Sequence, residues 1–217
     1  MNLNRTETVL NRCREIMSER INVMLLHVFG YAEALMHERA SREKGSAGGK
    51  LYTDGVRVIR LKKHEMQTRF KNSFTLLFQN QVRNLVRGGN NTDVKFVKDA
   101  SKFQVNGNNG QDHETLQSTV EQVRGDCHLA LLNLDNRISQ MLQDARIDSS
   151  NNPFRPETIF DAFWESCRDS EIKPEIRMML LKLFEHFMAL ELGYLYEDLN
   201  TYLARQDIES RQEPQLS

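Results

Sequence analysis

The sequence predicts an all-α protein, an elongated bundle of about five helices with an asparagine- and glycine-rich loop between the second and the third. Two observations carry this prediction. The 217 residues include only four prolines, which leaves long stretches free to form long helices. Apolar residues recur every three or four positions over most of the chain, which is the spacing of one helix face, and no alternating βα pattern is present.

The first 87 residues read as an N-terminal helical pair. The first helix is expected at about 5–39, and its apolar face consists of Val9, Cys13, Met17, Met24, Val28, Tyr31 and Leu35. Glycines and small residues at 45–49 then break the chain. The second helix is expected at about 53–87, with Asp54 as its cap and Gly55 in its first turn. Its apolar face consists of Met66, Phe70, Phe74, Leu77 and Leu85.

Residues 88–111 are expected to form a flexible loop or linker, because asparagine- and glycine-rich clusters stand at both of its ends. The third helix is expected at about 112–146. Nine apolar residues from Leu116 to Ala145 span 29 residues in eight steps, or about 3.6 residues per step, which is the period of a straight helix rather than of a supercoil.

Two further helices are each expected to begin at a proline, which is well tolerated at the first helical position. The fourth covers about 156–170, and the fifth covers about 174–205. The apolar stripe of the fifth consists of Ile176, Leu180, Leu183, Phe187, Leu190, Tyr194, Leu199 and Tyr202. Residues 112–205 therefore read as a three-helix C-terminal unit, and the polar residues 206–217 as a disordered tail.

The last two helices carry a resemblance to a known family. Its residues are Asn152-Pro153-Phe154-Arg155-Pro156-Glu157, Ala162-Phe163, Leu181-Lys182-Leu183-Phe184-Glu185, Leu192-Gly193-Tyr194-Leu195-Tyr196 and Leu199-Asn200. They resemble the leading portion of a long bacterial cytoplasmic family of unknown function, most clearly over residues 112–205. Some members carry the label thymidine phosphorylase, which the residues here do not support, since no glycine-rich phosphate loop follows a strand. The resemblance implies no catalytic residue.

Composition and motifs argue against several classes of function. The net charge of −1 favours neither nucleic acid nor membrane, and no apolar run approaches the length of a membrane span. Cys13, Cys127 and Cys167 are far apart and lack zinc-site spacing, which is typical of a reducing cytoplasm. None of the six histidines belongs to an HExxH or ExxH motif. We therefore expect no catalytic residue, metal or cofactor.

Charge is distributed unevenly along the chain. Residues 57–87 contain eight basic residues and one acidic residue, or +7, whereas residues 156–205 contain five basic and ten acidic residues, or −5. Four residues, which we call the basic group, are candidates for contacts with phosphate or another anion: Arg57, Arg60, Lys62 and Lys63. The alternative interpretation is an intramolecular match, in which the basic helix lies near the two acidic ones.

Four carboxylates recur every four residues along the predicted fourth helix. This acidic row, a candidate surface for a basic partner, consists of Glu157, Asp161, Glu165 and Asp169. The alternative is a solvated helix face opposite the apolar one. Aromatic residues also gather towards the end of the chain, and they either anchor an interface or fill the core: Phe154, Trp164, Tyr194, Tyr196 and Tyr202.

These observations favour a non-enzymatic helical interaction module with a regulatory or scaffolding role, and the resemblance implies that it belongs to a bacterial cytoplasmic protein. Its expected partner is a protein or a second copy of the chain. The alternative is nucleic-acid or anionic-ligand binding through the basic group. A third class, an enzyme with an atypical helical site, needs converging carboxylates and a histidine in an inward polar pocket.

Overall fold

The computed structural model describes residues 3–86, 109–142, 147–148, 151–168 and 171–208. Within these ranges it contains six α-helices, which are α1 (Leu3–Arg42), α2 (Ala47–Val86), α3 (Asn109–Asp126), α4 (His128–Leu142), α5 (Pro156–Ser166) and α6 (Pro174–Ala204). The predicted all-α class is confirmed. Most of the predicted loop 88–111, the end of the predicted third helix and most of the predicted tail lie outside the described residues.

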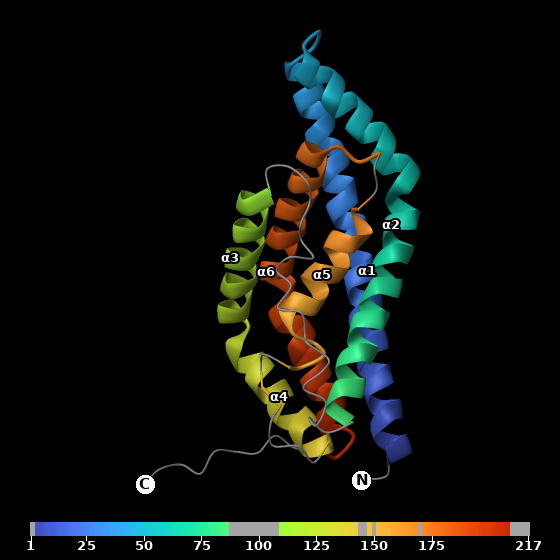
Figure 1. Cartoon of the computed structure of the whole chain (residues 1–217), viewed down its shortest axis with the longest axis vertical. Coiled ribbons are helices and arrows are strands. Elements are labelled where there is room, and N and C mark those ends of the chain that lie inside the picture. The colour runs from blue at the N-terminus through green and yellow to red at the C-terminus, as the bar shows by residue number, and fades with distance from the viewer. Residues whose placement is uncertain (1–2, 87–108, 143–146, 149–150, 169–170, 209–217) are drawn as a thin grey trace.

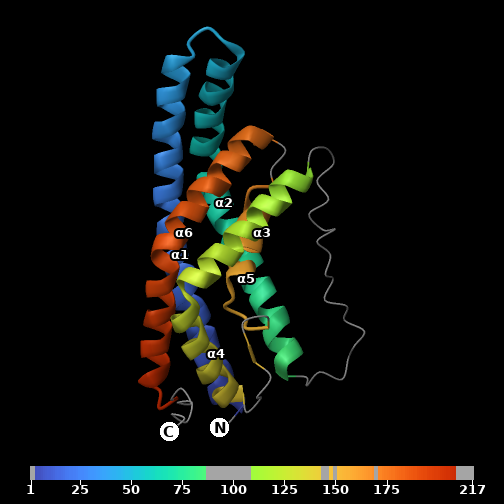
Figure 2. The same ribbon diagram turned by 90° about the vertical axis from the view of Figure 1, so that its left-hand side faces the viewer.

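The helices form an elongated bundle (Figure 1). Helices α1 and α2 make a long antiparallel hairpin, and its turn lies beyond the ends of the other helices (Figures 1 and 2). Helix α2 packs on α5 and α1 packs on α6, while α3 packs on both α5 and α6 and α4 packs on α6. The short α5 and the long α6 therefore lie between the hairpin and the α3–α4 pair.

The turn of the hairpin follows from small residues. Gly45 has a φ of 87°, which is in the left-handed region that favours glycine. The Ser46 hydroxyl accepts a hydrogen bond from the backbone N–H of Gly49 at 3.0 Å, and its carbonyl accepts the N–H of Lys50. Ser46 is thus the N-cap of α2, and the expectation that Asp54 caps this helix is wrong. Helix α2 consequently begins six residues earlier than the predicted residue 53.

The predicted third helix is bent at Cys127, which separates α3 from α4, and Figure 2 shows that the two run in different directions. The backbone N–H of Cys127 still donates to Val123 and that of Leu131 to the carbonyl of Cys127. The Cys127 thiol also donates to the Val123 carbonyl at 2.9 Å, and Gly125, a poor helix former, lies next to the bend. The expectation of a straight helix is therefore wrong.

One apolar core runs through the described helices. Phe70, Phe74 and Phe78 of α2 follow one another at ring-centroid distances of 5.9 and 6.4 Å, and Phe78 continues to Phe154 at 4.9 Å. Gly55 of α2 allows two neighbouring helices to approach. A Cβ atom there would lie 2.7 Å from the Met36 sulfur and 2.9 Å from Cδ1 of Ile176.

Helix α6 carries apolar residues on two faces. Its buried row consists of Ile176, Leu180, Leu181, Phe184, Met188, Leu192, Leu195, Tyr196, Leu199 and Leu203. The predicted stripe agrees with this row at Ile176, Leu180 and Leu199. It is wrong at Leu190 and Tyr194, which are 58% and 67% exposed. From Ile176 to Tyr194 the predicted stripe advances 18 residues in five steps, or 3.6 residues per step. The buried residues Ile176, Leu180, Phe184, Met188 and Leu192 instead advance four residues per step, so the two rows diverge along α6.

Candidate functional site

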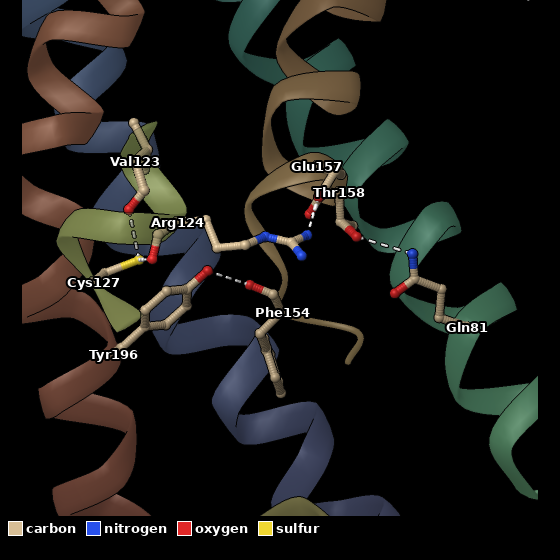
Figure 3. Close-up of polar contacts among 8 residues, drawn as sticks. All are labelled: Gln81, Val123, Arg124, Cys127, Phe154, Glu157, Thr158 and Tyr196. Atoms are coloured by element: carbon tan, nitrogen blue, oxygen red, sulfur yellow. Dashed lines mark hydrogen bonds and ion pairs between the residues drawn. The ribbon is translucent and has the colours of Figure 1, made fainter. Parts of the chain in front are cut away.

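The turn before α5 is held by buried polar contacts (Figure 3). The side-chain oxygen of Asn152 accepts the backbone N–H of Phe154 at 2.8 Å, and its amide donates to Asp135 of α4. The Tyr196 hydroxyl of α6 donates to the Phe154 carbonyl at 2.6 Å. Asn152, Phe154 and Tyr196 are all fully buried. Because a buried polar group without a partner is costly, these contacts specify one conformation for the turn.

The first turn of α5 is tied to two more helices (Figure 3). The Arg124 guanidinium of α3 donates to the carboxylate of Glu157. The Gln81 amide of α2 donates to the Thr158 hydroxyl at 2.9 Å. Residues 152–158, which include the first of the segments that carry the family resemblance, therefore contact the four helices α2, α3, α4 and α6.

Burial shifts the pKa of several groups in this interior. It raises the pKa of Asp135 to about 6, against the hydrogen bond from Asn152, which lowers it. It raises the pKa of the Cys127 thiol to about 11 and that of the Cys167 thiol to about 12. These thiols stay protonated at neutral pH, whereas a cysteine nucleophile needs its thiolate.

The basic group does not act as one free cluster. Arg60 forms an ion pair with Glu33 of α1 at 2.8 Å and contacts the His37 ring at 3.0 Å. Lys62 lies 3.2 Å from the carboxylate of Glu65 and 3.7 Å from that of Glu171. The contact with Glu171 joins the basic helix to the acidic region 156–205, as expected if the two charges match within the molecule.

Two members of the basic group remain for an external anion. Arg57 and Lys63 have no ion-pair partner among the residues that the structure describes. Arg57 lies at a groove of about 470 Å³ in the α1–α2 hairpin, which is lined by Arg57, Arg60, His37, Thr53, Val56 and Leu61.

The acidic row is divided among different surroundings. Glu157 is engaged with Arg124. Asp161 is half-buried, and burial raises its pKa to about 6 despite the nearby charge of Arg155. Glu165 is exposed and forms an i,i+3 pair with Arg168 at 3.0 Å. Asp169 lies outside the described residues.

An apolar surface, which we call the α6 outer face, is formed by the exposed residues Leu190 and Tyr194 of α6 and Tyr31 of α1, with the half-buried Phe187 between them. The three α6 residues have the i, i+3, i+7 spacing of one helix face. Tyr31, itself 57% exposed, meets Phe187 edge to face at a centroid distance of 6.4 Å. Of the aromatic residues expected to form an anchor or the core, Phe154, Trp164 and Tyr196 are buried, and Tyr194 is exposed.

A pocket of about 290 Å³ adjoins the α6 outer face, where the bend between α3 and α4 meets α6. Its inner side is formed by the buried residues Val123, Cys127 and Leu192. This pocket could not be predicted from the sequence, because it depends on the bend at Cys127. No group of three or more potential metal ligands occurs among the described residues. A membrane-crossing helix is likewise absent from the part of the chain that the structure describes.

The fold and these surfaces define an all-helical domain in which buried polar groups anchor one turn and in which α6 carries the exposed apolar residues Leu190 and Tyr194 besides its buried row. Residues 5–207 match the family model described as the N-terminal domain of a protein of unknown function, DUF1631, and the chain belongs to this family. This confirms the resemblance to the leading portion of a family of unknown function. No curated protein and no solved structure matches the chain.

Proposed function

We propose that the domain is a non-enzymatic interaction module that binds a helical segment of a protein partner on the α6 outer face. The observation that carries the proposal is the exposure of Leu190 and Tyr194 in the middle of a helix whose other face fills the core. A helix that is apolar on both faces is normally buried on both. Water contact with the second face is unfavourable, and covering it favours association.

The spacing of the apolar residues on this side of α6, of which Leu190 and Tyr194 are exposed and Leu183 and Phe187 are half-buried, indicates what covers them. Leu183, Phe187, Leu190 and Tyr194 alternate steps of four and three, which is the pattern by which one helix packs along another. Anchors at i, i+3 and i+7 are also typical of a helix that docks in a groove. Tyrosine is enriched in the cores of protein interfaces. A partner helix packed along this face is therefore the simplest occupant.

Capture from a lysate of the native host tests the proposal. The immobilised chain is compared with a Leu190→Glu/Tyr194→Glu variant and with a control, Leu61→Glu/Leu76→Glu. The control residues lie on α2 and are 69% and 58% exposed, close to the exposure of the α6 pair. We expect a discrete set of proteins to bind the wild type and the control, and at least tenfold less of it to bind the α6 variant.

Each captured protein is then purified and its binding measured, and sedimentation velocity separates self-association from binding of a different protein. Equal capture by the wild type and the α6 variant would remove this face as the interface. Turnover of a metabolite by the pure chain, lost on replacing one inward-pointing ionisable residue, would contradict the non-enzymatic role.

The alternative function is nucleic-acid or anionic-ligand binding at the groove beside Arg57 and Arg60, and the groove is the observation that favours it. Arg60 and Lys62 form ion pairs with carboxylates of the same chain, which reduces the positive charge available to an external anion. The informative substitutions are therefore Arg57→Glu and Lys63→Glu, with Lys182→Glu on α6 as the control. Binding to duplex DNA, RNA and nucleotides is measured over a salt series. Steep weakening with salt and loss in the two variants would favour this alternative.

The finer parts of the proposal are a regulatory or scaffolding role and a location in the bacterial cytoplasm. The three cysteines are free and buried, which is compatible with a reducing compartment. Among the three members of the acidic row that the structure describes, Glu165 is the exposed one, and it offers a second contact for a basic partner.

A further inference from the structure

The pocket beside the α6 outer face combines an apolar interior with an acidic rim. Val123, Cys127 and Leu192 are buried beneath it. Asp126, at the end of α3, and Glu197, on α6, are exposed at its edge. Its volume, about 290 Å³, lies at the lower limit of small-molecule sites, which typically measure about 300–1,000 Å³. It therefore has room for an inserted side chain rather than for a large cofactor.

Gly193 lines the same pocket in the interior of α6. Glycine in a helix interior costs about 1 kcal/mol relative to alanine, so an interior glycine usually has a packing reason. At Gly193 no such packing reason exists, since an added Cβ atom would meet no other atom within 4 Å. The missing side chain leaves space above the helix, and that space is the pocket.

The charge at the rim points to the kind of group that enters. Asp126 and Glu197 have no ion-pair partner within the described ranges of the chain. The Tyr194 ring also lines the pocket, and the face of such a ring attracts cations. Two carboxylates and an aromatic ring around an apolar interior suit a long side chain with an apolar stem and a positively charged end.

We infer that this pocket receives an arginine or lysine side chain projecting from the partner segment that covers the α6 outer face. The inference rests on the proposed function, because Leu190 and Tyr194 belong to both surfaces. The apolar anchors of the partner then pack on α6, and its basic residue places its stem over Gly193 and its charge between Asp126 and Glu197. The pocket makes the surface selective for partners with a basic residue beside their apolar row.

Amide chemical-shift titration of the purified chain tests the pocket without the partner. The probes are N-acetyl-arginine amide, N-acetyl-lysine amide and N-acetyl-citrulline amide, a neutral analogue of the first. We expect saturable shifts at Asp126, Cys127 and residues 193–197 with the two cationic probes. The neutral probe should bind at least tenfold more weakly.

Two variants locate the binding. Gly193→Met fills the pocket from its floor, and its control is Gly30→Met on α1, where an added Cβ atom also meets nothing within 4 Å. We expect at least a tenfold loss of arginine-probe affinity in Gly193→Met and none in Gly30→Met. Asp126→Asn/Glu197→Gln, which keeps the shape of the rim, should lose affinity to a similar extent.

The inference fails if the citrulline probe binds as well as the arginine probe, if Gly193→Met binds normally, or if no probe gives a saturable shift. These failures are distinct from failure of the proposed function. A different result is capture that depends on Leu190 and Tyr194 and yet is unchanged in Asp126→Asn/Glu197→Gln. That result would contradict binding of a basic side chain in the pocket and would still support the α6 outer face as the interface.

Discussion

The Tyr196 hydroxyl donates a hydrogen bond of 2.6 Å to the backbone carbonyl of Phe154, 42 residues away in the chain. Both residues are fully buried. The bond fixes the turn before α5 against α6, and Asn152 holds the same turn against α4 through Asp135. The turn before α5 is thus held to both α4 and α6 by buried hydrogen bonds.

Replacing Tyr196 with phenylalanine keeps the ring and removes the donor. The Phe154 carbonyl would then be buried without this partner, and we expect a loss of about 1–3 kcal/mol in the free energy of unfolding. Urea denaturation measures it. The matched control is Tyr194→Phe, where the hydroxyl belongs to an exposed side chain and the change should stay within about 0.5 kcal/mol. Equal effects of the two substitutions would show that the buried hydrogen bond contributes no stability.

The ion pair of Arg124 with Glu157 should couple α3 to α5. The two side chains are 29% and 33% exposed, so water screens the pair only in part. A double-mutant cycle with Arg124→Met and Glu157→Gln should give a coupling of about 0.5–3 kcal/mol. The exposed pair of Arg168 with Glu165 is the control, with an expected coupling of about 1 kcal/mol or less. A cycle that is additive for Arg124 and Glu157 would contradict the coupling.

Stability should fall as the pH rises from about 4 to about 6. Burial raises the pKa of Asp135 from 3.8 to about 6, so the folded state binds this proton more tightly than the unfolded state. The folded state is therefore favoured at low pH, and it loses that advantage as Asp135 ionises. The difference amounts to roughly 3 kcal/mol at most.

Urea unfolding at a series of pH values measures this effect. Asp135→Asn keeps an oxygen that can accept the Asn152 amide, and it should flatten the slope between pH 4 and 6. Asp161 also has a raised pKa, so Asp161→Asn is measured in parallel to separate the two contributions. An unchanged slope in Asp135→Asn would show that this carboxyl does not titrate as stated.

Two glycine-to-alanine substitutions should have effects of opposite sign. At Gly55 the new methyl group would meet the Met36 sulfur and Ile176, and overpacking of this kind costs about 1–3 kcal/mol, more than the helix gains. At Gly193 the methyl group would meet open space, and stability should rise by up to about 1 kcal/mol. Thermal and urea unfolding check both signs. If Gly55→Ala stabilised the protein, the side chains of Met36 and Ile176 would have to move aside at little cost.

Most helix boundaries could be predicted because local residues set them. Pro156 and Pro174 stand at the first positions of α5 and α6, as predicted, and the predicted ends differ from the observed ones by a few residues. The break near Gly45 was also predicted, although Ser46 rather than Asp54 caps the helix that follows. These features depend on the conformational preferences of single residues, which the sequence states directly.

The bend at Cys127 could not be predicted from the apolar spacing. The backbone bonds from Cys127 to Val123 and from Leu131 to Cys127 preserve the helical repeat through the bend, so the pattern continues without interruption. Gly125 was the available local signal. The pocket beside the α6 outer face depends on this bend, so the pocket could not be predicted either.

The sequence by itself determined that the chain is helical, where its helices begin, and that it carries opposite charges on different helices. Only the tertiary structure decided which apolar face of α6 enters the core and which charges find partners. The pairs Arg60–Glu33 and Arg124–Glu157 join residues 27 and 33 positions apart. Helix formation depends on neighbours within a few residues, whereas burial and ion pairing depend on contacts that the chain makes only after it has folded.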